Sequence, residues 1–140
     1  MILIIDKDGV LTDGKVYVTH KGEKFKAFNN KDNTAIAELI QMGYEVHIVT
    51  ASSWPGMDKY CHNLGVKTWV IRDKSQLNSI TGGKPYIAIG DSAWDIEMLK
   101  KAVKRFCPLD AEDEVKALDK MIVLNRKGGD GVILELLKWL

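Results

Sequence analysis

Short apolar runs alternate with helical patterns along the whole 140-residue chain, and this alternation is what most limits its fold. The run at residues 2–5 is apolar throughout, which is typical of a strand buried on both faces. Similar runs follow at residues 45–50, 67–71, 86–90, 103–107 and 121–123. Helical patterns separate them, at residues 33–42, 54–64, 73–80, 92–101, 111–118 and 132–140. Strands that alternate with helices predict an α/β fold, with helices on both faces of a mainly parallel sheet.

One pair of short runs departs from this alternation. Residues 15–19 and 24–28 are joined by His20-Lys21-Gly22-Glu23, which predicts a β-hairpin flap over about residues 15–28. The length suits a single domain over residues 1–140. No apolar run approaches the roughly 20 residues of a membrane-spanning helix, so we expect no membrane partner.

The charges of the chain are almost balanced. Lys and Arg number 20 and Asp and Glu number 19, which leaves a formal net charge of +1. Such a chain has no overall field that attracts nucleic acid, so a long nucleic acid is a poor candidate partner, although local patches stay open. Cys61 and Cys107 lie far apart without metal-ligand spacing, and we interpret them as reduced core thiols. Together these features favour a soluble, cytoplasmic protein.

Polar side chains follow the predicted strands at their carboxyl ends. In open parallel sheets, ligands bind in the crevice outside these ends, so polar residues there are candidates for function. The side chains expected at this edge are Asp6, Asp8, Thr50, Asp73, Lys74, Asp91 and Asp95.

The chemistry of this set points to a metal and a phosphoryl group. Clustered carboxylates repel one another unless a cation lies among them, and oxygen ligands suit Mg²⁺. A hydroxyl and an ammonium at the same edge suit a phosphoryl group. One carboxylate can attack phosphorus to form an aspartyl-phosphate, and a second can protonate the leaving oxygen and later deprotonate a water. We therefore predict that Asp6 and Asp8 face the site and that Lys7, between them, points away.

Four sequence motifs carry a family resemblance. The stretch Asp6-Lys7-Asp8-Gly9-Val10-Leu11-Thr12-Asp13-Gly14 resembles the first motif of the haloacid dehalogenase (HAD) superfamily, DxDGxxTDG. Thr50 matches its second motif, Lys74 its third, and Gly90-Asp91-Ser92-Ala93-Trp94-Asp95 its fourth, GDxxxD. The order and spacing agree along nearly the whole chain. The resemblance implies a HAD-like Rossmannoid fold with three α/β/α layers.

The resemblance also implies a role for each matched residue. Asp6 would be the nucleophile, and Asp8 would be the general acid and base. Thr50 would hydrogen-bond the phosphoryl group, and Lys74 would neutralise its charge. The implied Mg²⁺ ligands are Asp6, Asp8 through its carbonyl, and Asp91, with Asp95 in support. Taken alone, Asp91 is equally explained as the N-cap of the next helix.

A narrower resemblance follows from the hairpin. The segments between the motifs leave no room for a cap domain, and residues 14–32 look like those of the capless 3-deoxy-D-manno-octulosonate 8-phosphate (KDO 8-phosphate) phosphatases. Residues 128–132 are similar to the GGxGAV stretch of that family. The resemblance implies a homotetramer in which the hairpins close neighbouring sites. It also implies a small phosphorylated substrate, namely a sugar-acid phosphate such as KDO 8-phosphate or a related nonulosonate 9-phosphate.

The positions expected to bind substrate depart from the family. Its Thr-Gly-Arg is Thr50-Ala51-Ser52 here, its Arg-Asp-Gly is Lys31-Asp32-Asn33, and an arginine of the GGxG stretch is Asp130. Lysine and arginine are not equivalent in binding carboxylates or phosphates, and Asp130 reverses the charge. The predicted substrate-binding residues are Ala51, Ser52, Lys31 and Asp32.

Two other functions stay open. Trp54 and Trp94 follow the second and fourth motifs, and if both faced the site they could stack on a base. The substrate would then be a nucleotide or a polynucleotide 3′-phosphate, although helix packing explains both residues as well. An alternative from another class is a scaffold or regulatory subunit that has the fold and little catalytic activity.

Overall fold

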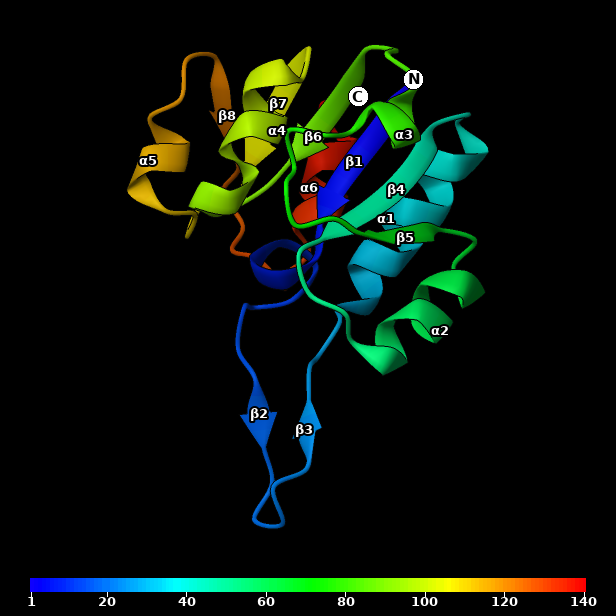
Figure 1. The fold of residues 1–140 in the computed structure, drawn as a ribbon, viewed down its shortest axis with the longest axis vertical. Coiled ribbons are helices and arrows are strands. Elements are labelled where there is room, and N and C mark those ends of the chain that lie inside the picture. The colour runs from blue at the N-terminus through cyan, green and yellow to red at the C-terminus, as the bar shows by residue number, and fades with distance from the viewer.

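A six-stranded sheet forms the centre of the computed structural model, which describes residues 1–140 (Figure 1). The strands run in the order β5-β4-β1-β6-β7-β8, and every neighbouring pair is parallel. They are β1 (Ile2–Asp6), β4 (Glu45–Thr50), β5 (Lys67–Val70), β6 (Tyr86–Ile89), β7 (Lys104–Cys107) and β8 (Met121–Val123). The predicted α/β class with a mainly parallel sheet is confirmed, and no cap domain covers the sheet.

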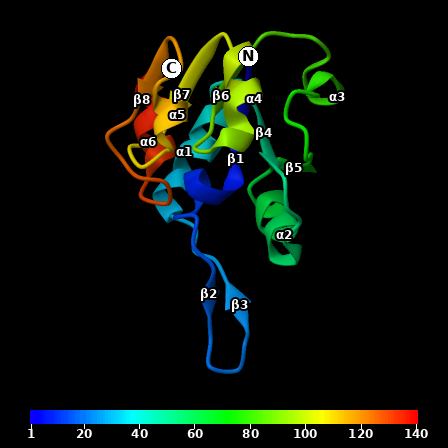
Figure 2. The ribbon, with the colours of Figure 1, turned by 60° about the vertical axis from the view of Figure 1, so that its left-hand side comes forward.

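Helices cover both faces of this sheet, as Figure 2 shows. Because successive side chains of a strand point to opposite faces, Leu3 and Ile5 enter one core while Ile2 and Ile4 enter the other. The first core is covered by α1 (Asn30–Gln41), α2 (Pro55–Asn63) and α6 (Val132–Leu137). The second is covered by α3 (Asn78–Thr81), α4 (Ile96–Lys101) and α5 (Asp113–Lys116). The sheet is therefore the middle of three layers.

The three helices predicted over the second core are shorter or less regular than the sequence pattern predicts. Asp73 Oδ1 accepts hydrogen bonds from the backbone N–H and the hydroxyl of Ser75, which favours a turn, so the helix predicted over residues 73–80 is reduced to α3. The helix predicted over residues 92–101 begins as a 3₁₀ turn at Ala93–Asp95 and continues as α4. The predicted helix at 111–118 is the single turn α5.

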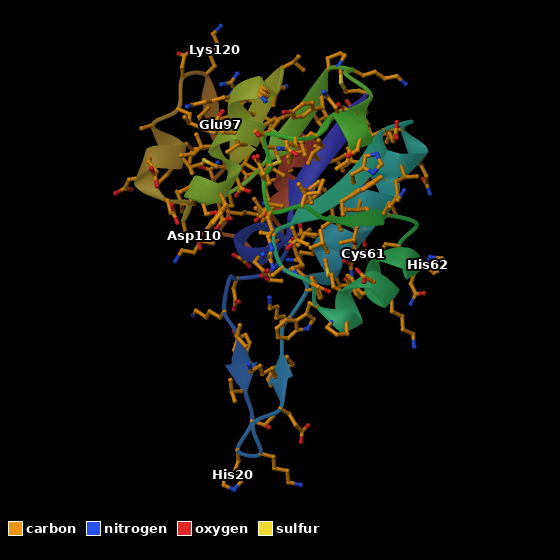
Figure 3. The ribbon with its side chains drawn as sticks, viewed as in Figure 1. His20, Cys61, His62, Glu97, Asp110 and Lys120 are labelled. Carbon is orange, nitrogen blue, oxygen red and sulfur yellow. The ribbon has the colours of Figure 1, made fainter.

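The predicted hairpin is present and extends away from the sheet (Figures 1 and 2). Its strands, β2 (Tyr17–Val18) and β3 (Lys24–Phe25), are antiparallel and shorter than the runs that predicted them. The rings of Tyr17 and Phe25 stack with their centroids 5.2 Å apart. His20 marks the tip of the hairpin, far from the sheet (Figure 3).

The two cysteines lie in the two cores. Cys61 belongs to the core under α1, α2 and α6, and Cys107 to the core on the opposite face. Both are free thiols, as predicted. No helix of the structure combines the length and the apolar character needed to cross a membrane.

Candidate active site

A small pocket opens at the carboxyl ends of the central strands. Its volume is about 110 Å³. It is lined by Asp6, Asp8, Thr50, Ala51, Ser52, Lys74, Ser92 and Trp94. The structure thus brings together six residues predicted for catalysis or substrate binding. A larger surface hollow, beside Ser75, Gln76, Asn78 and Ser79, contains no charged side chain.

A tight turn positions the first pair of carboxylates. β1 ends at Asp6, and the chain turns at once through residues 7–11, where Gly9 adopts a φ of 88°. A Cβ atom on Gly9 would lie 1.9 Å from Asp91 Oδ2, so only glycine lets the two loops approach this closely. The Thr12 hydroxyl accepts hydrogen bonds from the N–H groups of Gly9 and Gly14 and closes the turn.

Lys74 joins two carboxylates at the bottom of the pocket. Its Nζ lies 2.5 Å from Asp6 Oδ1 and 2.5 Å from Asp95 Oδ1. The second oxygen of Asp95 accepts hydrogen bonds from the N–H groups of Asp91 (2.9 Å) and Ser92 (3.1 Å). Asp95 is fully buried, with both oxygens occupied, so it orients Lys74 and the loop after β6 at the same time.

The carboxylates at this position carry more negative charge than Lys74 balances. Burial, reinforced by the charge of Asp95, raises the pKa of Asp6 well above its usual 3.8. The same two causes raise the pKa of Asp91 to about 7. Burial alone would lower the pKa of Lys74, but the charges of Asp6 and Asp95 outweigh it, so that the pKa rises and the ammonium is retained.

This part of the site suits a hard cation. Carboxylate oxygens of Asp6, Asp91 and Asp95 lie within 4.8 Å of one another, and Asp91 Oδ1 is buried without a hydrogen-bond partner. An unpaired buried oxygen is costly unless something pairs with it. Both oxygens of Asp95 already have partners, so the free carboxylate oxygens belong to Asp6 and Asp91, two of the three residues predicted to bind the metal.

Asp8 lies nearer the mouth of the pocket, where its side chain is 33% exposed. Lys26, from the hairpin, places its Nζ 2.7 Å from Asp8 Oδ1. The prediction that Lys7 points away is wrong: its ammonium is buried, donates to the Ser52 carbonyl at 3.1 Å and lies 3.5 Å from Asp8 Oδ2. The turn after Asp6 and the long stem of lysine allow this return, and burial lowers the pKa of Lys7.

The predicted substrate-binding residues separate into two groups. Ala51 and Ser52 line the pocket beside Thr50, whose hydroxyl hydrogen-bonds both the carbonyl and the N–H group of Ser52. Lys31 and Asp32 do not line it. Asp32 is buried, and its Oδ1 accepts hydrogen bonds from the first turn of α6, so it holds two helices together.

Trp94 lines the pocket, as the alternative hypothesis of base stacking required, but the sequence analysis missed three other residues of this region. Ser92 also lines the pocket, and its place inside the GDxxxD motif was the signal that could have found it. Lys7 and Lys26 contact Asp8, but no periodicity or spacing predicts those contacts. They depend on how the hairpin and the turn after β1 fold back onto the sheet.

Comparison with known proteins agrees with this geometry. A family model described as haloacid dehalogenase-like hydrolase matches residues 81–136. Over 65 residues, the chain is 38% identical to the KDO 8-phosphate phosphatases of Salmonella typhi and Escherichia coli K12, covering 46% of this chain. That match spans only 35% of the length of these relatives. The KDO 8-phosphate phosphatase of Haemophilus influenzae is 28% identical over 144 residues, which cover 96% of this chain and 78% of the relative.

Solved structures extend the likeness to the whole chain. The cobalt-bound form of the H. influenzae KDO 8-phosphate phosphatase has a TM-score of 0.86 at 27% identity, covering 99% of this chain and 85% of that one. The chain is therefore similar to haloacid dehalogenase-like hydrolases both in sequence and in fold. The KDO 8-phosphate phosphatase of Yersinia pestis also reaches a TM-score of 0.86 at 27% identity, covering 98% of this chain and 78% of that one.

Proposed function

We propose that this protein is a Mg²⁺-dependent phosphomonoesterase that hydrolyses a sugar-acid phosphate through a phosphorylated Asp6. The observation that carries the proposal is the joining of a nucleophile, an acid/base carboxylate, a hydroxyl and an ammonium around one pocket. These groups are Asp6, Asp8, Thr50 and Lys74, and they come from three separate parts of the chain. The intact set also argues against a purely structural role.

The metal would be held by Asp6 and Asp91, together with the backbone carbonyl of Asp8. The unpaired Asp91 oxygen and the raised pKa values of both carboxyl groups support this assignment. When bound, Mg²⁺ would offset the carboxylate charges and withdraw electrons from the phosphoryl oxygens. The oxygen-only ligand set is of the kind that Mg²⁺ prefers.

The protein groups would then divide the reaction into two steps. In the first, a carboxylate oxygen of Asp6 forms a bond to phosphorus, the bond from phosphorus to the leaving oxygen breaks, and Asp8 donates its proton to that oxygen. In the second, Asp8 takes a proton from water, the water oxygen attacks phosphorus, and the Asp6 carboxylate is released with inorganic phosphate. Lys74 and the Thr50 hydroxyl would hold the phosphoryl oxygens during both steps.

The substrate class rests on the relatives. The proteins of H. influenzae and Y. pestis that share this fold at 27% identity are named KDO 8-phosphate phosphatases. KDO 8-phosphate or a related nonulosonate 9-phosphate is therefore the first choice. A nucleotide is the second choice, because Trp94 is 71% exposed at the pocket and could face a base.

The hairpin supports a homotetramer. Val16, Val18 and Phe25 are 48%, 60% and 50% exposed, although apolar side chains grouped in this way are usually covered. A second copy of the chain would cover them and would narrow the open pocket. A cytoplasmic location fits the proposal, because both cysteines are free thiols.

The test is phosphate release with and without Mg²⁺ from KDO 8-phosphate, a nonulosonate 9-phosphate, hexose phosphates, mononucleotides and a 3′-phosphorylated oligonucleotide. Asp6→Asn serves as the blank. We expect Mg²⁺-dependent release with a preference for the sugar-acid phosphates. Preference for the nucleotides would mean that the substrate is a nucleotide and not a sugar-acid phosphate. No phosphate release above that of Asp6→Asn would overturn the proposal.

A further inference from the structure

Trp94 is the most exposed large apolar side chain of the molecule, at 71%. Unlike the other strongly exposed apolar residues, such as Val18 or Val103, it lines the pocket that contains the catalytic carboxylates. Single exposed apolar residues are common on protein surfaces. An indole at the mouth of a polar pocket is different, because any molecule that enters the pocket passes it.

The backbone beneath Trp94 is held firmly. The residue lies in the 3₁₀ turn Ala93–Asp95, where Ser92 and Asp95 bond each other's backbone N–H groups. The N–H group of Ala93 donates to Glu112 Oε2 at 2.9 Å, and Asp95 is anchored in turn by Lys74. The backbone of the turn is therefore already ordered, so little conformational entropy is lost when a ligand binds against the indole.

The pocket is too small for a whole substrate. Its volume of about 110 Å³ lies below the roughly 300–1,000 Å³ typical of small-molecule sites. Asp6 and Lys74 line its buried end, where a phosphoryl group would lie. The remainder of a substrate must then extend past the mouth, next to Trp94.

Trp54 does not share this position. Lys26 Nζ lies 4.3 Å from the centroid of its ring, and Trp54 packs against the core under α2. The hypothesis that both tryptophans face the site therefore reduces to Trp94 alone.

We propose that Trp94 is a specificity-determining residue whose indole face packs against a ring in the leaving group of the substrate. The inference rests on the proposed phosphatase function and adds the requirement for a ring. A pyranose and a nucleobase both present a flat face with apolar atoms, and covering such a face with indole removes apolar area from water. An acyclic leaving group offers no such face.

The experiment compares Trp94→Ala and Trp94→Phe on three substrates: KDO 8-phosphate, a nucleoside monophosphate and glycerol phosphate. We expect Trp94→Ala to raise KM on the order of tenfold for whichever ring-bearing substrate is used, as for base stacking on an aromatic side chain. KM for glycerol phosphate and kcat for all three should stay close to wild type, and Trp94→Phe should restore most of the loss. The matched control is Val103→Ala, which truncates another strongly exposed apolar side chain, one that does not line the pocket. The ring-bearing substrate that loses most identifies the ring as a sugar or a base.

An equal change in KM for all three substrates would overturn the inference, as would a smaller oligomer of Trp94→Ala in light scattering, which would show that Trp94 contacts a second copy. If the wild-type protein released no phosphate at all, the proposed function would fail separately. The inference would then be decided by binding of the same phosphates to Asp6→Asn, with and without Trp94→Ala. Weaker binding by the double variant than by Asp6→Asn alone supports the inference. Equal binding by the two variants, or no binding by either, overturns the inference.

Discussion

At the carboxyl ends of β1, β5 and β6, charged side chains are buried, whereas in the hairpin apolar side chains are exposed. Asp6, Lys74 and Asp95 are 6%, 4% and 0% exposed, while Val18 and Phe25 are 60% and 50% exposed. Each region reverses the usual distribution of side chains. Buried charge is costly unless it is paired, and exposed apolar groups are costly unless they are covered.

The two regions differ in how much of this unfavourable free energy is offset by contacts within the chain. At the pocket, Lys74 pairs with two carboxylates, and Asp91 is left with a buried, unpaired oxygen. In the hairpin, the Tyr17–Phe25 stack covers one face of each ring and little else. The pocket therefore leaves carboxylate oxygens that the proposed cation would pair with, whereas the hairpin leaves apolar side chains that the proposed second copy of the chain would cover.

The largest effect is expected for Asp6→Asn, because it removes the proposed nucleophile and leaves the fold in place. We expect kcat for phosphate release to fall about 10³-fold or more. The matched control is Asp119→Asn, which changes an exposed carboxylate in the same way and should leave kcat unchanged. Near-normal turnover by Asp6→Asn would assign the chemistry to another group.

Lys74→Met should strongly destabilise the protein, because it leaves Asp6 and Asp95 buried without their cation. The expected loss in the free energy of unfolding is about 3–5 kcal/mol, measured by urea titration. Lys100→Met, which breaks the exposed pair with Glu97, should lose at most about 1 kcal/mol. Adding Asp95→Asn to Lys74→Met should cost less than the two changes separately, and strict additivity would contradict the proposed coupling.

Mg²⁺ should stabilise the protein increasingly as the pH rises. The pKa of Asp91 is raised from its usual 3.8 to about 7 in the folded protein, so protonation of Asp91 favours the folded state. This contribution to the free energy of unfolding is fully present below pH 3.8 and is lost as the pH rises through about 7. Mg²⁺ requires the carboxylate form, so its effect on Tm should be larger at pH 8 than at pH 6. At a concentration 100 times Kd, the gain would be about 2.7 kcal/mol.

Asp91→Asn tests whether the Asp91 carboxylate itself binds the metal. It should raise the Tm of the metal-free protein near pH 8, because it removes a buried charge, and it should weaken the response to Mg²⁺. An undiminished response of Asp91→Asn to Mg²⁺ would place the metal elsewhere.

The smallest effect on the fold of each subunit is expected in the hairpin. Val18→Ser with Phe25→Ser should change the free energy of unfolding of the monomer by about 0.5 kcal/mol or less, since both side chains are exposed. The oligomer should nevertheless dissociate, as measured by sedimentation velocity. Val103→Ser, at a site of similar exposure outside the hairpin, should leave the assembly intact. A wild-type protein that is monomeric at micromolar concentration would contradict the tetramer proposal.

Local patterns were enough to predict the layers, the strands and the edge at which the site lies. Apolar runs that alternate with helical patterns specify a parallel sheet, and the residue after each strand follows from where the run ends. Asp6 and Thr50 were therefore placed at the pocket, and Asp91 next to Asp6, without knowledge of the packing. The helix at residues 73–80 was predicted too long, because the side chain of Asp73 competes for the backbone.

Contacts between distant parts of the chain were decided by the tertiary structure. Asp32 holds the first turn of α6, 101 residues away, and Lys26 reaches Asp8 from the hairpin. Lys7 turns back to Ser52, although it was predicted to point away from the site. Sequence periodicity indicates the face of a helix or strand from which a side chain projects. The partner of a long polar side chain depends instead on which buried polar groups still lack a hydrogen-bond or charge partner once the chain has packed.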